Sequence, residues 1–387
     1  MIGEFYAWME TVQPTKSNLL YVVLYAVQRR YLRQGMPLGR IVFRRHMLYT
    51  GFRGEQAIYR RIKMKYRRFV LILVLFIAVF AMLQGANASA DETEYTQTVC
   101  PLERNGTALY LSQTLLSGTQ PQKQILLVHG VTYSSHEFDI DYEDYSLVRL
   151  LARNGYGVWQ LDIAGFGRSE NVGDGLMVDS AYAAEDIHAA AEKIIRETGQ
   201  EKIDVLGWSW GTVTVSRFAA AHPEMIDRLI LYAPILCGIG HYEVTEPFHH
   251  NTWEHAADDF QRCPDGSFDE SVTDPAILEW FCSSCWHYDG ESSPNGGRRE
   301  ICVDPSVPLI NLKKISSTTL VICGDQDPYL DYHLVNRCLD DLPDGSALEM
   351  IPGGAHVVFM EKPYYHDFQE RLLRFLQDEI SVNDAAA

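Results

Sequence analysis

The sequence predicts an α/β fold with a mainly parallel central sheet flanked by helices, and three observations support this. From about residue 107 onward, short apolar runs typical of buried parallel strands alternate with segments of helical periodicity. One run leads directly into Gly207-Trp208-Ser209-Trp210-Gly211, a pattern typical of a tight strand-to-helix turn. The alternation stops between residues 235 and 305 and then resumes. Repeated strand–helix–strand units imply parallel strands with helices on both faces.

The elements of this core follow one another in a regular order. Strands are predicted at 107–111, 125–128, 157–161, 203–206, 228–234, 318–323 and 347–351. Apolar residues at helical spacing predict helices at 146–154, 179–197, 212–222 and 364–380. Residues 91–234 and 306–387 are therefore expected to form one catalytic core.

Residues 235–305 are predicted to be a lid inserted after the strand predicted at 228–234. The segment is rich in aromatic, histidine and acidic residues and shows no strand–helix alternation. Ligands of open α/β sheets bind at the carboxyl ends of the strands, which such an insertion would cover. The lid's Trp253 and Trp286, with Tyr133 and Trp208 of the core, are candidate pocket residues, although the lid tryptophans could equally form a small core of their own.

His249, His250 and His255 lie near acidic residues of the same segment. Their spacing matches no specific ligand motif, so a solvated surface is the preferred interpretation. No metal and no cofactor are predicted.

The charge of the chain is divided unevenly. Its 387 residues carry a net charge of −18, but residues 1–68 contain 14 Lys or Arg against 3 Asp or Glu. The remainder is therefore strongly acidic and would repel nucleic acid, which is not expected as a partner. The acidic balance does not identify a substrate.

Residues 64–90 read as a signal peptide or a membrane anchor. A basic stretch at 64–68 is followed by 15 apolar residues from Phe69 to Leu83 and by small residues ending in Ala88-Ser89-Ala90. This order is typical of a cleaved secretory signal, which predicts a secreted or periplasmic protein. An uncleaved 69–83 would instead attach the catalytic part to a membrane. The basic residues 1–63 would then be either an upstream extension from a misassigned start or a cytoplasmic tail.

All eight cysteines follow the proposed cleavage site. An even number in an exported chain is compatible with disulfides, and Cys263, Cys282, Cys285 and Cys302 could form two bridges by any of three pairings, which is preferred over a metal site. The Cys282-x-x-Cys285 pair alone is weaker support for zinc.

Two further motifs follow Ser209 in the order that nucleophilic catalysis by a hydroxyl requires. Gly324-Asp325-Gln326-Asp327-Pro328 comes after one predicted strand, and Gly353-Gly354-Ala355-His356 comes after the next. A serine hydroxyl is a poor nucleophile at neutral pH and needs an adjacent base, which His356 would provide. A carboxylate would orient that base and stabilise its protonated form.

Four motifs, taken together and in this order along the chain, resemble the α/β-hydrolase family over roughly residues 107 to 380. They are His129-Gly130, Asp162-x-x-Gly165-x-Gly167-x-Ser169, Gly-Trp-Ser-Trp-Gly, and the late acid and histidine. The resemblance implies Ser209 as nucleophile, His356 as base, and Asp327 rather than Asp325 as the acid. It also implies that the backbone N–H groups of Val131 and Trp210 form the oxyanion hole.

The expected function is hydrolysis of a carboxylic ester, or a related acyl compound of apolar character, through an acyl-enzyme. The elbow is also similar to that of proline iminopeptidases, but these usually carry His-Gly-Gly-Pro-Gly where this chain has His129-Gly130-Val131. An aminopeptidase, with Glu243, Glu246 or Asp258 holding the substrate's amino group, remains an alternative. An acyltransferase with the same three residues is another, and a non-catalytic binding protein is less favoured because all three positions hold competent residues.

Overall fold

A computed structural model describes residues 94–378. The basic extension at 1–63 and the signal peptide or anchor at 64–90 lie outside these residues. Within the described range no helix is both long and apolar enough to cross a lipid bilayer.

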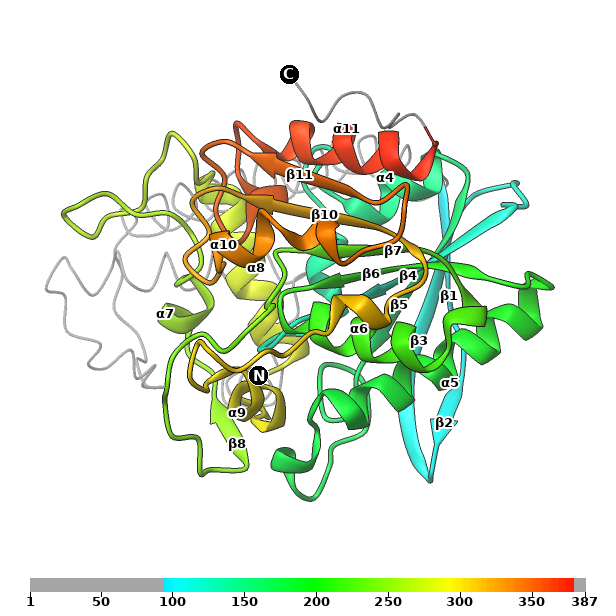
Figure 1. Ribbon diagram of the computed structural model, residues 1–387, viewed down its shortest axis with the longest axis horizontal. Helices are drawn as coiled ribbons and strands as arrows, with labels where there is room; N and C mark the ends of the chain where they lie inside the picture. Colours follow the sequence, from blue (N-terminus) through cyan, green and yellow to red (C-terminus); the bar gives the residue numbers. More distant parts are fainter. Residues whose placement is uncertain (1–93, 379–387) are drawn as a thin grey trace, which may run out of the picture. The chain divides into compact units, whose positions relative to one another are not determined.

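The predicted α/β fold with a mainly parallel sheet is confirmed (Figure 1). In the described residues the central sheet has nine strands in the order β1-β3-β5-β4-β6-β7-β10-β11, with β2 paired to β3. The parallel strands are β4 (Lys123–Val128), β5 (Tyr156–Asp162), β6 (Ile203–Trp208), β7 (Ile226–Tyr232), β10 (Thr318–Gly324) and β11 (Ala347–Ile351). The antiparallel edge comprises β1 (Tyr95–Val99), β2 (Leu102–Arg104) and β3 (Thr107–Leu116). Sequence analysis missed β1 and β2, which have little apolar alternation.

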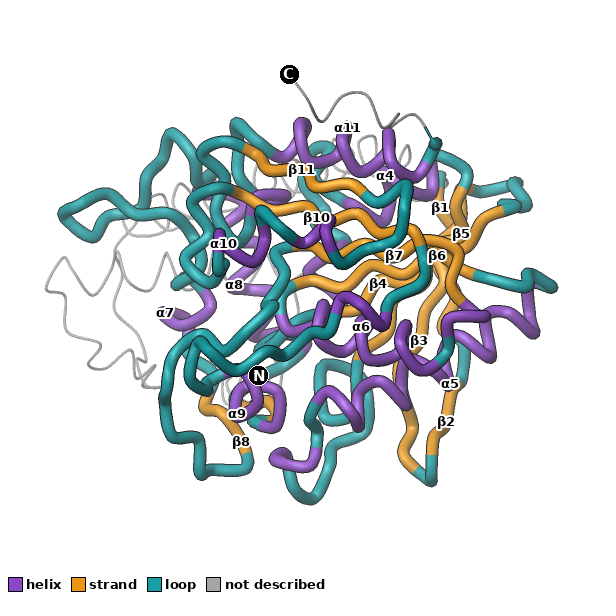
Figure 2. Tube along the Cα trace, viewed as in Figure 1, coloured by secondary structure: helices purple, strands orange, loops and turns teal. Residues whose placement is uncertain are grey.

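Helices cover both faces of the sheet (Figure 2). Because successive side chains of a strand point to opposite faces, Leu126 of β4 enters one apolar cluster and Leu127 enters the other. Helices α5 (Ser180–Thr198) and α6 (Trp210–Ala221) contribute to the first cluster. Helices α4 (Leu147–Arg153) and α11 (Tyr365–Leu376) contribute to the second. Two apolar cores thus fix the strand ends on which the site is built.

Several short elements lie between β7 and the last helix. They are β8 (Phe248–His250), α7 (Trp253–Ala256), α8 (Pro275–Tyr288), β9 (Ser292–Pro294), α9 (Gly296–Ile301) and α10 (Tyr332–Val335). Strands β8 and β9 form a small antiparallel pair. Apolar residues of α8 and α9 join the two main clusters, so the inserted segment has no separate core in the described residues.

Helix α8 was not predicted from the sequence, although the sequence carries a helix start and helical apolar spacing there. The Asp274 side chain accepts the Ala276 N–H at 2.9 Å, and proline stands at the first helical position. The buried residues Ile277, Phe281 and Cys285 recur every four positions and face the core. A cap followed by this spacing could have predicted the helix.

The expected disulfides are wrong for this structure, because all eight cysteines are free. Cys282 and Cys285 lie one turn apart on the same buried side of α8, where they pack as small apolar groups. Burial raises the pKa of the Cys282 thiol to about 11 and holds that of Cys285 well above its ordinary value. Both thiols therefore stay protonated and unreactive at neutral pH.

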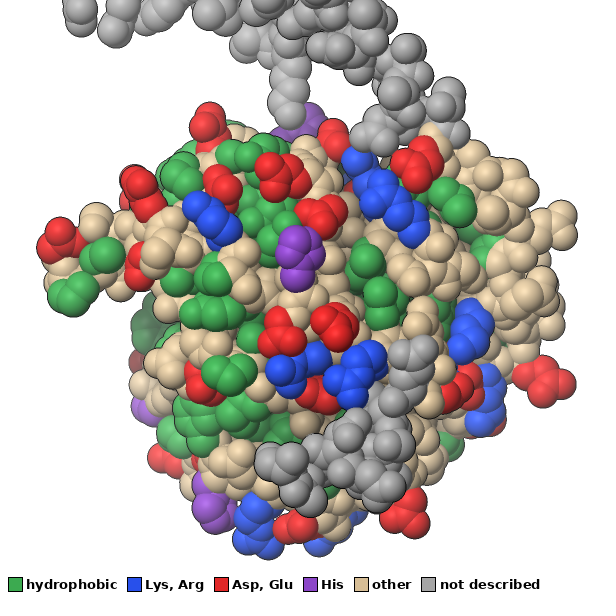
Figure 3. All heavy atoms as spheres, turned by 90° about the horizontal axis from the view of Figure 1, so that it is seen from above, with side chains coloured by type: hydrophobic (Ala, Val, Ile, Leu, Met, Phe, Trp, Pro, Cys, Tyr) green, Lys and Arg blue, Asp and Glu red, His purple; other side chains and the backbone are tan. Residues whose placement is uncertain are grey.

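Acidic, basic and apolar side chains are interspersed on the face in Figure 3, which is seen from above relative to Figure 1. No basic field is visible there.

Candidate active site

The Ser209 backbone takes the strained conformation of a nucleophile turn. Its φ of 57° and ψ of −126° lie where residues with a Cβ are rarely found. The residue ends β6 and immediately precedes α6, and its N–H donates to the Tyr232 carbonyl at 3.0 Å. The turn therefore presents the serine side chain at the carboxyl end of the sheet.

Glycines make this turn possible because the backbone around it is crowded. A Cβ on Gly211 would lie 2.6 Å from the His129 carbonyl oxygen, and one on Gly207 would lie 2.4 Å from the Gly211 carbonyl oxygen. A Cβ on Gly130 would lie 2.9 Å from the Cβ of Ser209. Because Gly130 has no side chain, the loop after β4 can pack directly against Ser209.

The structure joins His356 to Asp327. The imidazole Nδ1 lies 2.8 Å from Oδ2 of Asp327, and the two side chains are 4% and 0% exposed. Burial opposes protonation of His356, but the Asp327 carboxylate outweighs it, so the net effect raises the imidazole pKa above its ordinary value. The Tyr329 ring meets the imidazole edge-on at 4.8 Å between centroids.

Asp325, the competing acid, has a different position. Its Oδ1 accepts the Gly353 N–H at 2.7 Å, in the turn that leads to His356. The Gln326 N–H donates to the Gly354 carbonyl at 2.8 Å. Asp325 thus helps to fasten the acid loop to the histidine loop, and Asp327 is the carboxylate that reaches the imidazole.

Sequence analysis missed two side chains that hold the histidine loop. Glu361 is fully buried; its Oε2 accepts the Ala355 N–H at 2.9 Å, and its Oε1 accepts the Gln261 amide at 2.8 Å. Gln261 also donates to the Gly353 carbonyl at 2.9 Å. Since Gln261 belongs to the inserted segment, that segment helps to position His356. Neither residue stands in a motif, so no local signal marks them.

Ser209 and His356 line the same cavity. Two hollows of about 110 and 30 Å³ meet around them, and both are also bordered by Val131, Thr132 and Asp259. Val131, the expected residue of the oxyanion hole, therefore lies beside Ser209. The His129 ring holds its loop, since Nε2 accepts the Ile163 N–H at 3.0 Å.

Trp210 is the first residue of α6, so its backbone N–H has no partner within the helix. The indole is fully buried and donates from Nε1 to Glu300 at 3.1 Å. Its side chain thus fixes the helix start, while its N–H remains available next to Ser209.

Comparison with known proteins agrees with this architecture. A family model described as the alpha/beta hydrolase fold matches residues 123–261, which include the nucleophile turn. The chain has the α/β-hydrolase fold. A protein of Synechocystis sp. named "Putative non-heme chloroperoxidase" is 26% identical over 274 residues, covering 65% of this chain and 91% of that one.

Solved structures show the same fold at low sequence identity. A bromoperoxidase from Bacillus anthracis is 18% identical with a TM-score of 0.52, covering 73% of this chain and 100% of its own. Epoxide hydrolase A from Mycobacterium thermoresistibile is 14% identical with a TM-score of 0.51, covering 73% and 98%. These likenesses concern the fold of the hydrolase and leave its substrate open.

Two of the four expected pocket residues lie beside the hydrolase's nucleophile. Tyr133 and Trp208 line the smaller hollow, and the Trp208 indole also donates to the His356 carbonyl at 3.2 Å. Trp253 and Trp286 line neither hollow and are 45% and 48% exposed. Both indoles are exposed on α7 and α8, so the structure does not bring them to the cavity of Ser209.

The cavity of the hydrolase is lined instead by polar groups that sequence analysis largely missed. Asp258, Asp259, His255 and Arg298 border the larger hollow, and Glu137 borders the smaller one. Burial, followed by the charge of Asp289, raises the pKa of Glu137 well above its ordinary value. Only Asp258 and His255 stood out in the sequence, because of their clustering.

Of the three histidines singled out in the inserted segment, His255 borders this cavity. The ring centroids of His249 and His255 are 4.5 Å apart. Burial is the main cause that lowers the pKa of both imidazoles, and the positive charge of Arg298 lowers it further. Among residues 94–378 no group of three or more His, Cys, Asp or Glu side chains is arranged to hold a metal ion.

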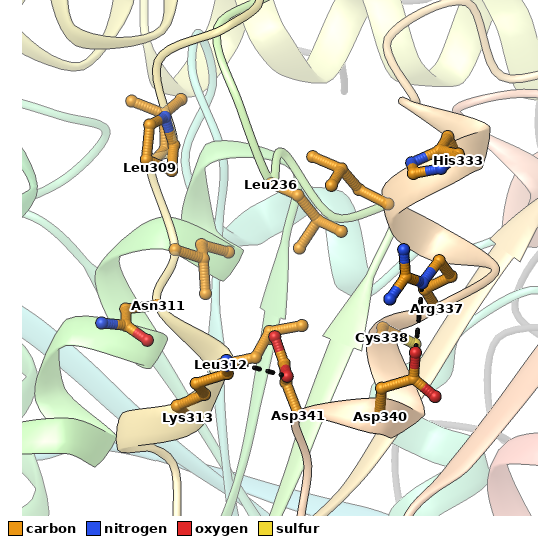
Figure 4. Close-up of a pocket in the computed structure, with 13 residues that line it drawn as sticks. Leu236, Leu309, Asn311, Leu312, Lys313, His333, Arg337, Cys338, Asp340 and Asp341 are labelled. Carbon is orange, nitrogen blue, oxygen red and sulfur yellow. Dashed lines mark hydrogen bonds and ion pairs between the residues drawn. The ribbon is translucent and has the colours of Figure 1, made fainter.

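A larger hollow of about 540 Å³ lies elsewhere in the hydrolase, between the 308–313 segment and α10 (Figure 4). None of the three candidate catalytic side chains borders it. Its charged groups already pair, Lys313 with Asp341 at 3.5 Å and Arg337 with Asp340 at 3.1 Å. Size alone therefore does not mark the functional cavity.

Proposed function

We propose that this α/β-hydrolase cleaves a carboxylic ester, or a related acyl compound, through an acyl-enzyme on Ser209. The observation that carries the proposal is the shared cavity of Ser209 and His356, with His356 bonded to the buried Asp327. A serine at this turn also argues against epoxide hydrolysis, since the epoxide hydrolases of this fold use aspartate as the nucleophile.

In the proposed reaction, the Ser209 hydroxyl attacks the acyl carbon while Nε2 of His356 takes its proton. The Nδ1–H of His356 donates to Asp327, which fixes the tautomer and stabilises the imidazolium. The imidazolium then protonates the leaving alcohol, giving the acyl-enzyme. Water attacks next, with His356 again acting as base, and the acid is released.

The negative oxygen formed during attack would be bound by the backbone N–H groups of Val131 and Trp210. Both stand next to the nucleophile, one bordering the cavity and the other at the helix start. Each such donor typically contributes about 3 kcal/mol to the transition state. The positive end of the α6 dipole adds to this stabilisation.

The small cavity favours a small acyl group. The hollows of about 110 and 30 Å³ are well below the volume of pockets for drug-sized ligands, which starts at about 300 Å³. The inserted segment supplies His255, Asp259 and Arg298 to the cavity wall, which supports its proposed role as a lid.

The first experiment compares the hydrolase with its Ser209→Ala variant on 4-nitrophenyl esters of graded chain length. We expect wild-type turnover to be greatest with short acyl chains and the variant to lose activity by about 10⁶-fold. Fluorophosphonate labelling should disappear as well, with an unchanged melting temperature showing that the fold persists. Labelling that survives in the variant would exclude Ser209 as the nucleophile.

A second candidate is an aminopeptidase, because Asp258 and Asp259 border the cavity of Ser209. Carboxylates in this position could hold a substrate's α-amino group. Glu243 and Glu246, also considered from the sequence, border neither hollow. Comparing amino-acid 4-nitroanilides with short-chain esters separates the two functions, since a preference for the anilides would favour the peptidase.

We also propose that the catalytic part acts outside the cytoplasm. This proposal rests on the 64–90 sequence alone, because the eight free thiols remove the support expected from disulfides. Sequencing the amino terminus of the native protein tests it. A mature end at Asp91 would support export by cleavage, whereas a retained Met1 would contradict cleavage and favour attachment of the catalytic part to a membrane through residues 69–83.

A further inference from the structure

Arg298 places a positive charge at the cavity of the nucleophile. Its side chain borders the larger hollow together with Ser209 and His356. The guanidinium donates to two neutral acceptors, the Thr132 hydroxyl and the Asn295 amide oxygen, the latter at 3.2 Å. In the described part of the chain it forms no ion pair, and Asp259 is instead engaged by the Tyr329 hydroxyl at 2.9 Å.

Burying the positive charge of Arg298 is energetically unfavourable. Burial lowers the pKa of Arg298, yet a guanidinium stays protonated in proteins, so the charge remains. A largely buried cation that no carboxylate of the described residues contacts directly is less stable than in water, and Asp259 acts on it only at a distance. A ligand anion would offset this cost.

The position of Arg298 is fixed by the packing of α9. Gly297 lies against Trp210, since a Cβ there would be 2.5 Å from the indole. Glu300, one turn along, accepts the Trp210 indole N–H at 3.1 Å and the Ser180 N–H at 3.0 Å. These contacts hold α9 against the nucleophile helix, so the guanidinium is pre-positioned beside the reaction centre.

Independent evidence for a polar ligand comes from unpaired atoms of the same cavity. Nδ1 of His255, the hydroxyl of Tyr133 and Oε1 of Glu137 are buried and have no hydrogen-bond partner. All three residues border the hollows around Ser209. Buried polar atoms are normally paired, so three orphans at one cavity indicate groups that a polar substrate would satisfy.

From these observations we infer that the substrate carries a carboxylate, which pairs with Arg298 while Ser209 attacks its ester carbonyl. The inference rests on the proposed ester hydrolysis and names its substrate class. The planar guanidinium fork matches a carboxylate in two parallel hydrogen bonds. Asp258 is exposed to solvent at the cavity, so its repulsion of an anion is screened.

Binding to the Ser209→Ala protein tests the inference without requiring turnover. Calorimetry would compare two anionic esters, monomethyl adipate and 4-acetoxybutyrate, with their neutral carboxamide counterparts. These probes place the carboxylate on the acyl side and on the alcohol side respectively. We expect at least one anion to bind roughly 10- to 100-fold tighter than its amide, as charge-assisted hydrogen bonds predict.

The second variant, Ser209→Ala with Arg298→Gln, should lose this advantage, and Arg298→Lys should restore part of it. Arg299→Gln is the matched control, because Arg299 is exposed and donates to the Leu176 carbonyl at 2.8 Å away from the cavity. It should keep the full advantage. An equal affinity for anion and amide, an advantage that survives Arg298→Gln, or tighter binding of a cationic 6-aminohexanoate ester would overturn the inference.

Parallel turnover assays separate this inference from the proposed function. If wild-type protein hydrolyses neutral esters but shows no anion advantage, the carboxylate inference fails alone. If the anion binds through Arg298 but no ester is cleaved, the proposed hydrolysis fails and the binding site stands.

Discussion

At the scale of single residues, two neighbouring carboxylates of the hydrolase differ in what they contact. Asp327 is fully buried against the His356 imidazole, whereas Asp325 accepts a backbone N–H in the adjoining loop. Both occupy one turn after β10, yet only one can influence the protonation of the base. The same turn therefore holds the proposed catalytic acid, Asp327, and two positions before it a carboxylate that fastens two loops together.

Replacing the two carboxylates by amides should give opposite results. Asp327→Asn is expected to lower kcat by about 10⁴-fold, because an amide cannot stabilise the imidazolium or hold the correct tautomer. Asp325→Asn keeps an acceptor for the Gly353 N–H and should reduce kcat far less. Steady-state ester hydrolysis checks both; a larger loss in Asp325→Asn would reverse the assignment.

The pH dependence of the hydrolase should report the His356–Asp327 pair. Catalysis needs the neutral imidazole, and the Asp327 carboxylate raises the pKa of His356, so kcat/KM should fall as the pH drops through a midpoint above about 6.5. In Asp327→Asn the midpoint should move down. A pH–rate profile of both proteins measures the shift, and an unchanged midpoint would contradict the pairing.

The His356–Asp327 pair also makes the stability of the folded protein depend on pH. Because the folded pKa of His356 is raised, its stabilising contribution is fully present below the unfolded value of about 6.5. The contribution is lost as the pH rises through the folded pKa.

At the scale of elements, the strand–turn–helix unit of β6 and α6 depends on close backbone contact. Gly211 lies where a Cβ would be 2.6 Å from the His129 carbonyl oxygen and 2.7 Å from that of Val128. These are backbone atoms of β4 and its loop, so they cannot move aside as a flexible side chain would. The helix start is thereby pressed onto the neighbouring strand.

Gly211→Ala should lower the free energy of unfolding by about 1–3 kcal/mol, because the added methyl group overpacks a rigid site. Gly173→Ala is the control, since a Cβ there meets no atom within 4 Å. Its effect should stay within about 0.5 kcal/mol. Urea unfolding measures both, and equal effects would show that the close approach is not limiting.

At the scale of the whole molecule, the described fold is held by two continuous apolar clusters and not by cross-links. The inserted segment contributes to both clusters, and all eight cysteines are free. We expect eight thiols to react with Ellman's reagent in unfolded protein without reductant, and dithiothreitol to leave the melting temperature unchanged. Fewer reactive thiols, with a melting temperature that falls on reduction, would restore the disulfide hypothesis.

Sequence reasoning succeeded where the signal is local. The apolar run before Ser209, the helical spacing in α5 and the order of the serine, acid and histidine motifs all depend on neighbours in the chain. It failed where the partner is distant. Glu361 and Gln261 meet across 100 residues, and the outward direction of Trp253 and Trp286 depends on how short helices dock.

The sequence by itself determined the strand–helix alternation, the turn that holds Ser209 and the set of side chains able to react, because periodicity and glycine placement act over a few residues. Only the tertiary structure decided which groups border the cavity and that all eight cysteines are free, and it placed Asp327 against His356 as the resemblance implied. These outcomes follow from packing between segments that lie far apart in the chain, and local patterns carry no information about such distances.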